Sequence, residues 1–339
     1  MSLRDEIDML KNSNHLLYPK ILQVEITNRC PFQCPQCYKD IYNMKDMDWN
    51  LLKNLIKEAH EIGVKSIMIN GGEPLIYEYF VDFIRLLTSL GMYGYCFTSG
   101  YGINEQFIND MMGQNISISI SLNGSTEKIN SLSRDGYAQS IKALALLKKC
   151  SLPFGINWVA RADNVHDFPN MIRLGEQYGA SWINVIANKM GCDGKLNSPM
   201  TRADYQLLST YIKEYPHKNF IRIENCFSLL KVYGDFCINS SIKGCHAAID
   251  CCSVDIDGNF MPCSHLQYKE SYPTIYEYWN HSEILEKLRN MNSSEKSYCK
   301  DCLHNKNCRF CLAVSISTHN DFSVGIQNCP VREVSEHEV

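Results

Sequence analysis

Short apolar runs alternate with amphipathic helical segments from residue 20 to about residue 215, and this alternation constrains the fold more than any other feature of the 339-residue chain. Strands that alternate with helices pair in parallel and are joined by right-handed crossovers. Six such units predict an α/β protein built on a partial, TIM-like (β/α)6 barrel. A doubly wound parallel sheet is the second interpretation, because periodicity does not give the strand order. The expected strands are Leu22–Thr27, Lys65–Asn70, Tyr93–Thr98, Ile116–Leu122, Gly155–Arg161 and Trp182–Ala187.

The helices between these strands carry start and stop signals. Gly63, Gly91 and Gly179 each follow an amphipathic stretch, and glycine often ends a helix because it adopts the left-handed conformation. Thr201 and Asp204 have the spacing of a capping box. The expected helices are Asp48–Ile62, Tyr79–Leu90, Tyr137–Lys149, Val165–Tyr178 and Arg202–Tyr215, with a further amphipathic helix within residues 1–19.

Charge and hydropathy exclude several classes of protein. The net charge is −4 without a run of Lys or Arg, so neither a nucleic-acid surface nor an anionic-membrane surface is predicted. No apolar run is long enough to span a membrane, and the first residues lack the apolar core of a signal peptide. We therefore expect a cytoplasmic protein with reduced cysteines, in which clustered cysteines bind metal more often than they form disulfides.

Eleven of the seventeen cysteines fall into groups with ligand-like spacing. Cys30, Cys34 and Cys37 follow the first strand, separated by three and two residues. A four-iron cluster closed by protein takes four thiolates. Three thiolates leave one iron open, and an open metal position is typical of a catalytic site. A structural zinc knuckle, or buried thiols, is the alternative. We interpret the six scattered cysteines as small buried hydrophobes: Cys96, Cys150, Cys192, Cys226, Cys237 and Cys252.

Other unusual residues also follow predicted strands. Gly71-Gly72-Glu73-Pro74 comes after the second strand, Ser99 ends the third and Ser121 ends the fourth. In parallel barrels, active residues lie at the C-terminal ends of the strands. The two glycines would let the backbone approach a ligand closely, and Glu73 could bond an ammonium group. Taken alone, this tetrapeptide would be an ordinary turn.

With C-x3-C-x2-C after the first strand and GGEP after the second, the chain resembles the radical SAM superfamily. In that family the open iron is chelated by S-adenosylmethionine (SAM), and an electron from the cluster releases a 5′-deoxyadenosyl radical that abstracts hydrogen from substrate. Two residues depart from the family pattern, Gln36 in place of a bulky side chain and Asn123 in place of a common Asp. The resemblance implies SAM contacts at Gly71, Gly72, Glu73, Pro74, Ser99, Ser121 and Arg134.

The last third of the chain has a second cysteine pattern. Residues 216–244 are expected to form a connector, followed by a hairpin with its turn at Asp257-Gly258 and by a helix near Ser282–Met291. A zinc ribbon is one interpretation of the two CxxC pairs, although their five-residue gap is shorter than the usual loop between zinc knuckles. The pattern is Cys245-x12-Gly258-x4-Cys263, then Cys299-x2-Cys302-x5-Cys308-x2-Cys311, and Cys329.

This pattern resembles the SPASM extension of some radical SAM enzymes, which holds two auxiliary clusters. The resemblance implies one cluster on Cys245, Cys251, Cys263 and Cys311, with Cys252 as the alternative to Cys251, and another on Cys299, Cys302, Cys308 and Cys329. The implied cofactors are thus SAM and three 4Fe-4S clusters. The expected organisation is an N-terminal helix (1–19), a radical SAM barrel (20–215), a connector (216–244), a SPASM module (245–330) and a tail (331–339).

SPASM enzymes mostly modify peptides or proteins, so the resemblance implies oxidative maturation of a ribosomal peptide, with an electron donor such as flavodoxin or ferredoxin. Only about 20 residues precede the first strand. The peptide would therefore be held by the barrel directly or brought by a separate leader-binding protein. Sulfatase-maturing relatives carry Asp directly after the GX4C cysteine, whereas Ser264 and His265 follow Cys263 here, which disfavours that reaction.

Two alternatives stay open at this point. One is dehydrogenation or epimerisation of a small molecule, with an unassigned thiol as a hydrogen donor in the epimerase case. The other is a metal-stabilised binding protein that never cleaves SAM. No catalytic acid or base is assigned. His265, Asp255 and Tyr268 are expected in a solvated loop.

Overall fold

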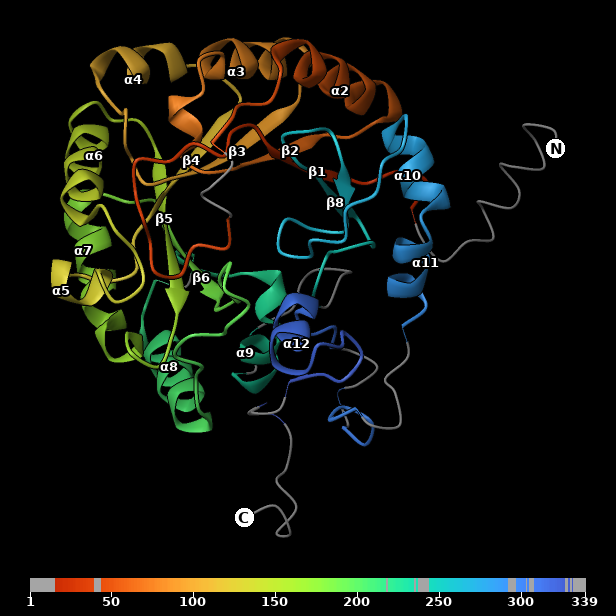
Figure 1. Ribbon diagram of the computed structural model, residues 1–339. Helices are drawn as coiled ribbons and strands as arrows, with labels where there is room; N and C mark the ends of the chain where they lie inside the picture. Colours follow the sequence, from red (N-terminus) through yellow and green to blue (C-terminus); the bar gives the residue numbers. More distant parts are fainter. Residues whose placement is uncertain are drawn as a thin grey trace.

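The computed structural model describes residues 16–39, 44–217, 219–234, 236, 244–291, 297–302, 304, 308–326, 329 and 331. The expected helix within residues 1–19 falls almost wholly outside these ranges, and so does Cys237. Within them, strands form a curved sheet with helices on its outer side (Figure 1).

The strands follow one another around the arc in chain order. The sheet order is β7-β6-β5-β4-β3-β2-β1-β8-β9, and every pairing is parallel except that of β8 with β9. A doubly wound sheet would start near its middle and reverse direction, so the predicted partial barrel is confirmed. The strands are β1 (Ile21–Glu25), β2 (Ser66–Asn70), β3 (Tyr93–Thr98), β4 (Ile116–Ser121), β5 (Phe154–Ala160), β6 (Trp182–Ala187), β7 (Ile221–Ile223), β8 (Cys251–Val254) and β9 (Phe260–Met261).

The expected crossover helices are present with nearly the predicted ends. Gly63 and Gly179 end their helices in the left-handed conformation, and Thr201 and Asp204 form the predicted capping box. The elements between β1 and β7 are α2 (Trp49–Ile62), η1 (Pro74–Ile76), α3 (Phe80–Ser89), α4 (Glu105–Met111), α5 (Glu127–Asn130), α6 (Tyr137–Lys149), η2 (Val165–Asp167), α7 (Phe168–Tyr178) and α8 (Arg202–Glu214).

The core lies between the sheet and these helices, because successive strand residues face opposite sides. In β1, Leu22 and Val24 are fully buried beneath the helices, with Leu52 and Ile56 of α2 in the same cluster. Gln23, which lies between Leu22 and Val24, faces the inside of the barrel and lines its cavity. The two faces of one strand therefore serve the core and the cavity.

The cysteine-rich region is part of the barrel sheet. The predicted hairpin is present as β8 and β9, and β8 pairs in parallel with β1, Ile21 lying beside Cys251. The segment expected as a connector contains β7, which pairs with β6. Figure 1 shows α9 and α12 between the two ends of the arc. The remaining elements are η3 (Asn225–Phe227), α9 (Ser228–Tyr233), α10 (Ile275–His281), α11 (Glu283–Arg289) and α12 (Leu312–His319).

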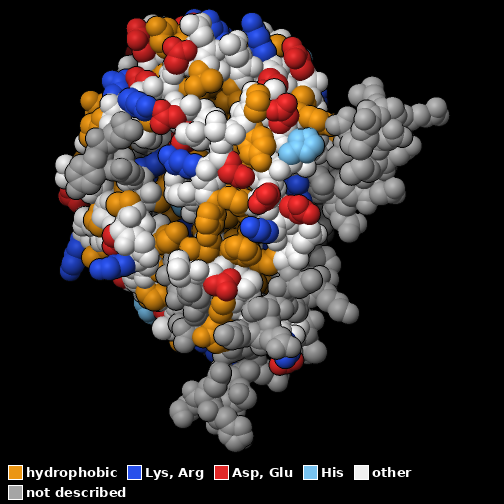
Figure 2. Space-filling view, turned by 45° about the vertical axis from the view of Figure 1, so that its right-hand side comes forward, with side chains coloured by type: hydrophobic (Ala, Val, Ile, Leu, Met, Phe, Trp, Pro, Cys, Tyr) orange, Lys and Arg blue, Asp and Glu red, His pale blue; other side chains and the backbone are white. Residues whose placement is uncertain are grey.

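The surface carries both signs of charge. On the face drawn in Figure 2, hydrophobic side chains gather near the middle, with Lys and Arg side chains interspersed among Asp and Glu around them. Among the described residues, no helix has the length and apolar character needed to cross a membrane.

Candidate active site

The cysteine loop, residues 26–39, is held firmly at its base. The Arg29 guanidinium contacts both carboxylate oxygens of Asp46 (2.9 and 2.6 Å), and Thr27 Oγ1 donates to the same carboxylate (2.6 Å). Cys37 N–H donates to the Cys34 carbonyl (3.0 Å) and closes a tight turn. Burial raises the pKa of the Cys30 thiol to about 11 and also raises that of Cys37. Partly buried thiols on a fixed loop suit a metal that would bind them as thiolates.

The Gly71-Gly72 turn packs directly against this loop. Gly72 N–H donates to the Thr27 carbonyl (2.7 Å), and Glu73 N–H donates to the Arg29 carbonyl (2.9 Å). A Cβ atom at Gly72 would lie 2.1 Å from the Arg29 carbonyl oxygen, and one at Gly71 would lie 2.3 Å from that of Thr27. These glycines therefore let the turn pack against the backbone of the cysteine loop. This contact joins the ends of β1 and β2.

The Glu73 carboxylate is saturated by protein donors. It accepts hydrogen bonds from Thr98 Oγ1 (2.5 Å), Ser99 N–H (2.8 Å), Ser99 Oγ and Leu75 N–H (3.2 Å). A carboxylate offers about four lone-pair sites, so an added ammonium group would have to share sites that are already occupied. Burial raises the pKa of Glu73, and the hydrogen bonds from Ser99 and Thr98 act against this effect. Glu73 and Ser99 thus fix the end of β3 to the GGEP turn.

One cavity of about 500 Å³ joins the predicted site residues. It opens inside the barrel, at the C-terminal ends of the strands and along the barrel wall below them. Its lining includes every predicted SAM-contact residue except Pro74, and three of the cysteines predicted for the first auxiliary cluster. From the predicted set the lining residues are Cys30, Cys34, Cys37, Gly71, Gly72, Glu73, Ser99, Ser121, Arg134, Cys245, Cys263 and Cys311.

Arg134 brings an unpaired donor to the cysteine loop. Within the described part of the chain, its Nε is buried without a hydrogen-bond partner. The neighbouring backbone contacts the loop directly, since Gln36 N–H donates to the Ser133 carbonyl (3.2 Å) and Asp135 N–H approaches Cys34 Sγ (3.4 Å). A partly exposed guanidinium whose buried Nε lacks a partner beside the cysteines fits an anionic ligand group.

The two departures from the family pattern have structural roles. Gln36 accepts a hydrogen bond from Arg161 (2.8 Å) and donates to Asn188, tying the cysteine loop to the ends of β5 and β6. Asn123 accepts from Val159 N–H (3.1 Å) and donates to Ser133 Oγ (2.9 Å). Both amides use donor and acceptor at once, which a carboxylate or an aromatic ring could not do.

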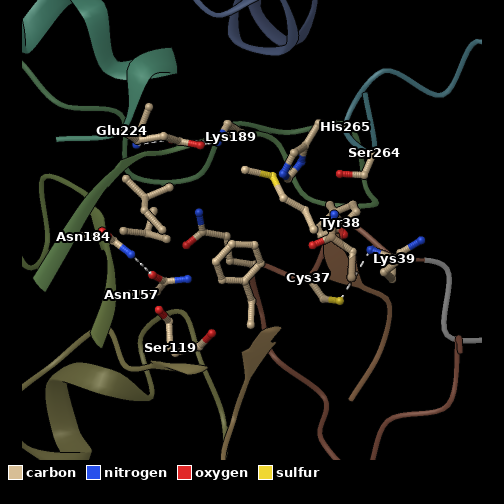
Figure 3. Close-up of a pocket in the computed structure, with 18 of the residues that line it drawn as sticks. Cys37, Tyr38, Lys39, Ser119, Asn157, Asn184, Lys189, Glu224, Ser264 and His265 are labelled. Atoms are coloured by element: carbon tan, nitrogen blue, oxygen red, sulfur yellow. Dashed lines mark hydrogen bonds and ion pairs between the residues drawn. The ribbon is translucent and has the colours of Figure 1, made fainter. Parts of the chain in front are cut away.

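The inside of the barrel is polar on one wall. Ser121, Asn157, Asn184 and Arg222 lie side by side on β4 to β7, and Asn184 Nδ2 donates to Asn157 Oδ1 (2.6 Å). Figure 3 shows Ser119, Asn157 and Asn184 around the cavity. Closed barrels fill this space with bulky branched side chains. The small serines and the amides here leave room for a polar ligand.

The pleat of β8 separates Cys251 from Cys252. Residues side by side on neighbouring parallel strands face the same side. Cys251 pairs with Ile21 and Ser253 with Gln23, which lines the cavity, so Cys251 faces the barrel interior. Cys251 lies close enough to Cys263 to interact with it electrostatically. Cys252 instead interacts with Arg289 and Glu58, on the opposite side of the strand.

The second predicted group, Cys299, Cys302, Cys308 and Cys329, also comes together. Burial raises the pKa of Cys308 to about 11, and the other three thiols interact with it electrostatically. Among the residues that the structure describes, no three His, Cys, Asp or Glu side chains converge tightly enough to hold one metal ion. A four-iron cluster does not need such convergence, because each thiolate binds a different iron.

Sequence reasoning missed two features of the cavity. Cys226, interpreted as a buried hydrophobe, follows β7 within η3 and lines the cavity together with Cys245 and Cys311. The short segment Ile221-Arg222-Ile223 before it was the available signal, since it repeats the order of strand then cysteine seen at Cys30. Lys189 and Glu224, in contact at 3.1 Å, follow β6 and β7 at the same end.

His265 is not in a solvated loop. Its ring packs on Tyr38 with centroids 4.2 Å apart and lines the cavity, as Figure 3 shows. Burial lowers the pKa of His265 well below its ordinary value, so the ring is neutral. Asp255 is also buried, paired with Lys269 at 2.8 Å, whereas Tyr268 is exposed as expected.

Comparison with known proteins gives a family for this site. Residues 24–175 match the model of the radical SAM superfamily. The PqqA peptide cyclase of Granulibacter bethesdensis is 28% identical over 174 residues, which are 48% of this chain and 46% of that protein. The match thus spans about half the length of that relative. The AdoMet-dependent heme synthase of Methanosarcina barkeri is 20% identical over 90% of this chain and 94% of its own.

A solved structure shares the fold over nearly the whole chain. Streptococcus suis SuiB, in a crystal structure with its precursor peptide SuiA, superposes with a TM-score of 0.79 at 17% identity, covering 97% of this chain and 80% of SuiB. The family match begins within β1, includes the cysteine loop and the GGEP turn, and ends within α7. Residues 24–175 of this chain therefore match the radical SAM superfamily, and the relatives named above are enzymes, which favours an enzyme over a binding protein.

Proposed function

We propose that the chain binds a 4Fe-4S cluster through Cys30, Cys34 and Cys37, and SAM on the remaining iron. When bound, the cluster supplies the electron that cleaves SAM reductively to the 5′-deoxyadenosyl radical. Arg134 would meet the SAM carboxylate, since its buried Nε lacks a partner among the described residues. Ser121 would contact the ribose from the end of β4. The GGEP turn and Ser99 would shape the site, because Glu73 is already saturated by protein donors.

The two further cysteine groups would each hold an auxiliary 4Fe-4S cluster. The first auxiliary site is Cys245, Cys251, Cys263 and Cys311, and the second is Cys299, Cys302, Cys308 and Cys329. Four thiolates close such a cluster, which suits electron transfer better than substrate binding. The observation that carries the proposal is the single cavity, since it has the radical-generating cysteines on one wall and Cys245, Cys263 and Cys311 on another. A substrate in it could lose hydrogen on one side and an electron on the other.

The proposed substrate is a peptide, and the proposed reaction is its oxidative modification. Asn157, Asn184 and Ser119 present donors and acceptors that match peptide amides. The similarity to a peptide cyclase and to the fold of a peptide-bound enzyme supports this class. Initial reduction would come from a flavodoxin or ferredoxin, and a separate leader-binding protein could deliver the peptide.

A small-molecule dehydrogenation or epimerisation is the second candidate, because about 500 Å³ lies within the range of small-ligand pockets of roughly 300–1,000 Å³. Turnover of candidate substrates in heavy water separates the reactions. Epimerisation puts deuterium into the product, whereas oxidation yields a product two hydrogens lighter.

Metal analysis after anaerobic purification tests the proposal. The wild type should contain about twelve iron atoms per chain and make 5′-deoxyadenosine from SAM when reduced. The triple variant Cys30→Ala, Cys34→Ala, Cys37→Ala should keep about eight iron atoms and make none. Zinc at the auxiliary sites would overturn the electron-transfer role. A folded, iron-loaded wild type that leaves SAM intact would overturn the whole function.

A further inference from the structure

An arginine, Arg222, faces the inside of the barrel from strand β7. In the sheet, Arg222 lies beside Asn184 of β6, and Asn184 lies beside Asn157 of β5. Residues side by side on parallel strands face the same side, so Arg222 faces the cavity together with these two amides. Among the described residues, its guanidinium has neither an ion-pair partner nor a hydrogen-bond acceptor.

The Arg222 guanidinium stacks on the indole ring of Trp182, and its central carbon lies 4.3 Å from the ring centroid. Trp182 begins β6, two residues before Asn184 and on the same face. The indole lies across Gly155 of β5, where a Cβ atom would approach its nitrogen to 2.0 Å. A stacked guanidinium is held by one face, and its N–H groups stay free to bind a carboxylate through two parallel hydrogen bonds. Trp182 therefore orients Arg222 without using its donors.

The charges nearest to Arg222 along the chain and around the cavity are already paired. Glu224 follows two residues later, and both of its carboxylate oxygens lie 3.1 Å from Lys189 Nζ. Figure 3 shows this pair at the cavity. Lys39, the other lysine in the described lining, contacts the buried carboxylate of Glu25. The positive charge of Arg222 is therefore available to a ligand.

We propose that Arg222, stacked on Trp182, binds a carboxylate of the peptide substrate, either an Asp or Glu side chain or the C-terminal carboxylate. Asn184 and its hydrogen-bond partner Asn157 would bind peptide amides next to that carboxylate. The inference rests on the proposed function, which makes the ligand a peptide, and adds the chemistry by which the site selects among peptides. Arg134 has a different role in the proposed function, because it lies beside the cysteine loop and meets SAM.

A peptide-selection experiment tests the proposal on the full-length chain loaded with its clusters and SAM. The unreduced protein is incubated with two pools of short random peptides, one amidated and one with free C-termini, and the retained peptides are sequenced by mass spectrometry. The wild type should prefer peptides with the carboxylate about tenfold, as expected for one charged, hydrogen-bonded pair. Side-chain recognition enriches Asp and Glu in both pools, whereas C-terminal recognition favours the pool with free C-termini.

Substitutions at Arg222 separate recognition from folding. Arg222→Gln should abolish the preference for carboxylates, and Arg222→Glu should replace it with a preference for Lys and Arg side chains. Arg222→Lys keeps the charge but loses the planar fork, so it should keep an intermediate preference. Arg173→Gln removes an exposed positive charge from the outer helix α7 and is the matched control, which should select peptides as the wild type does.

Several results would overturn the inference, and each has a different meaning. A wild type that retains peptides without preferring carboxylates, or a preference that survives in Arg222→Gln, would show that Arg222 does not bind this group. Equal loss of neutral and acidic peptides in all three Arg222 variants would make the role of Arg222 structural. Weaker SAM binding by Arg222→Gln in equilibrium dialysis would place Arg222 in the SAM site. A wild type that cleaves SAM but retains no peptide from either pool would overturn the proposed peptide substrate, and this inference with it.

Discussion

At the residue scale, the carboxylate of Glu73 and the amide of Gln36 hold the segments around the cysteine loop in place. Glu73 accepts from donors on β3 and on its own turn, and Gln36 reaches Arg161 and Asn188. The donors and acceptors of each side chain are paired with acceptors and donors of its partners. Substitutions of similar size that change the donor and acceptor pattern should therefore have large effects.

Glu73→Gln should lower the free energy of unfolding by about 2 kcal/mol, because the amide group would leave at least one buried donor of Thr98 or Ser99 without an acceptor. Chemical denaturation measures this change, and SAM binding should weaken with it. Glu78→Gln, at an exposed position five residues along, is the matched control. Equal stability of the two variants would contradict the saturated-carboxylate interpretation.

Gln36→Leu should lower the free energy of unfolding by about 1–2 kcal/mol, because Arg161 and Asn188 each lose a hydrogen-bond partner. Leucine roughly keeps the side-chain volume of glutamine. The loss is local to the cysteine loop, so iron should leave the Cys30–Cys37 site faster under a chelator than it does in wild type. Gln33→Leu changes an exposed residue of the same loop and should release iron at the wild-type rate. Identical release from all three proteins would rule out a role for Gln36 in holding the loop.

At the element scale, the pairing of β8 with β1 decides which of Cys251 and Cys252 faces the barrel interior. The register sets Cys251 beside Ile21, and the pleat turns Cys252 toward the opposite side. A shift of one residue would exchange the two thiols. The hairpin could be predicted from Asp257-Gly258, but its strand partner is separated from it by more than 200 residues.

Cys251→Ala should remove about four iron atoms per chain, whereas Cys252→Ala should keep them, because only Cys251 shares the interior face with the rest of the site. Iron and sulfide analysis of the two variants measures this directly. Retention by Cys251→Ala together with loss by Cys252→Ala would reverse the assignment.

At the scale of the whole molecule, the cysteine-rich region continues the barrel sheet and packs against the barrel helices. It adds β8 and β9 to the sheet, Ile275 N–H bonds to Glu58 of α2 (2.6 Å), and Trp279 Nε1 bonds to the Leu16 carbonyl (2.7 Å). Buried residues of α10 and α11 belong to the same core cluster as those of the barrel. The two regions therefore share their stability.

A chain ending at residue 244 should fail to fold as a soluble barrel, because β1 would become an open edge strand and part of the core under α2 would be exposed. Circular dichroism and size-exclusion chromatography of this fragment would show aggregation or a markedly lower melting temperature. A monomeric fragment with the full-length melting temperature would mean that the region is independent after all.

The sequence by itself determined the local features: six of the strands, five helices with their glycine ends and the Thr201 cap, and the spacing of the cysteine groups. Each depends on neighbouring residues, through periodicity, turn chemistry or ligand spacing. The sequence predicted that Gly71 and Gly72 allow a close approach of the backbone. It did not predict what they approach, because the Thr27 and Arg29 carbonyls follow a different strand.

Only the tertiary structure decided the features that depend on distant pairing. β7 is three residues long, too short to give a periodic signal, and yet it brings Cys226 to the cavity. The neutral His265 and the interior position of Cys251 follow from β8 joining β1. The physical reason is the same in each case, since burial and facing are set by which strands pair, and strand pairing is a property of the whole sheet.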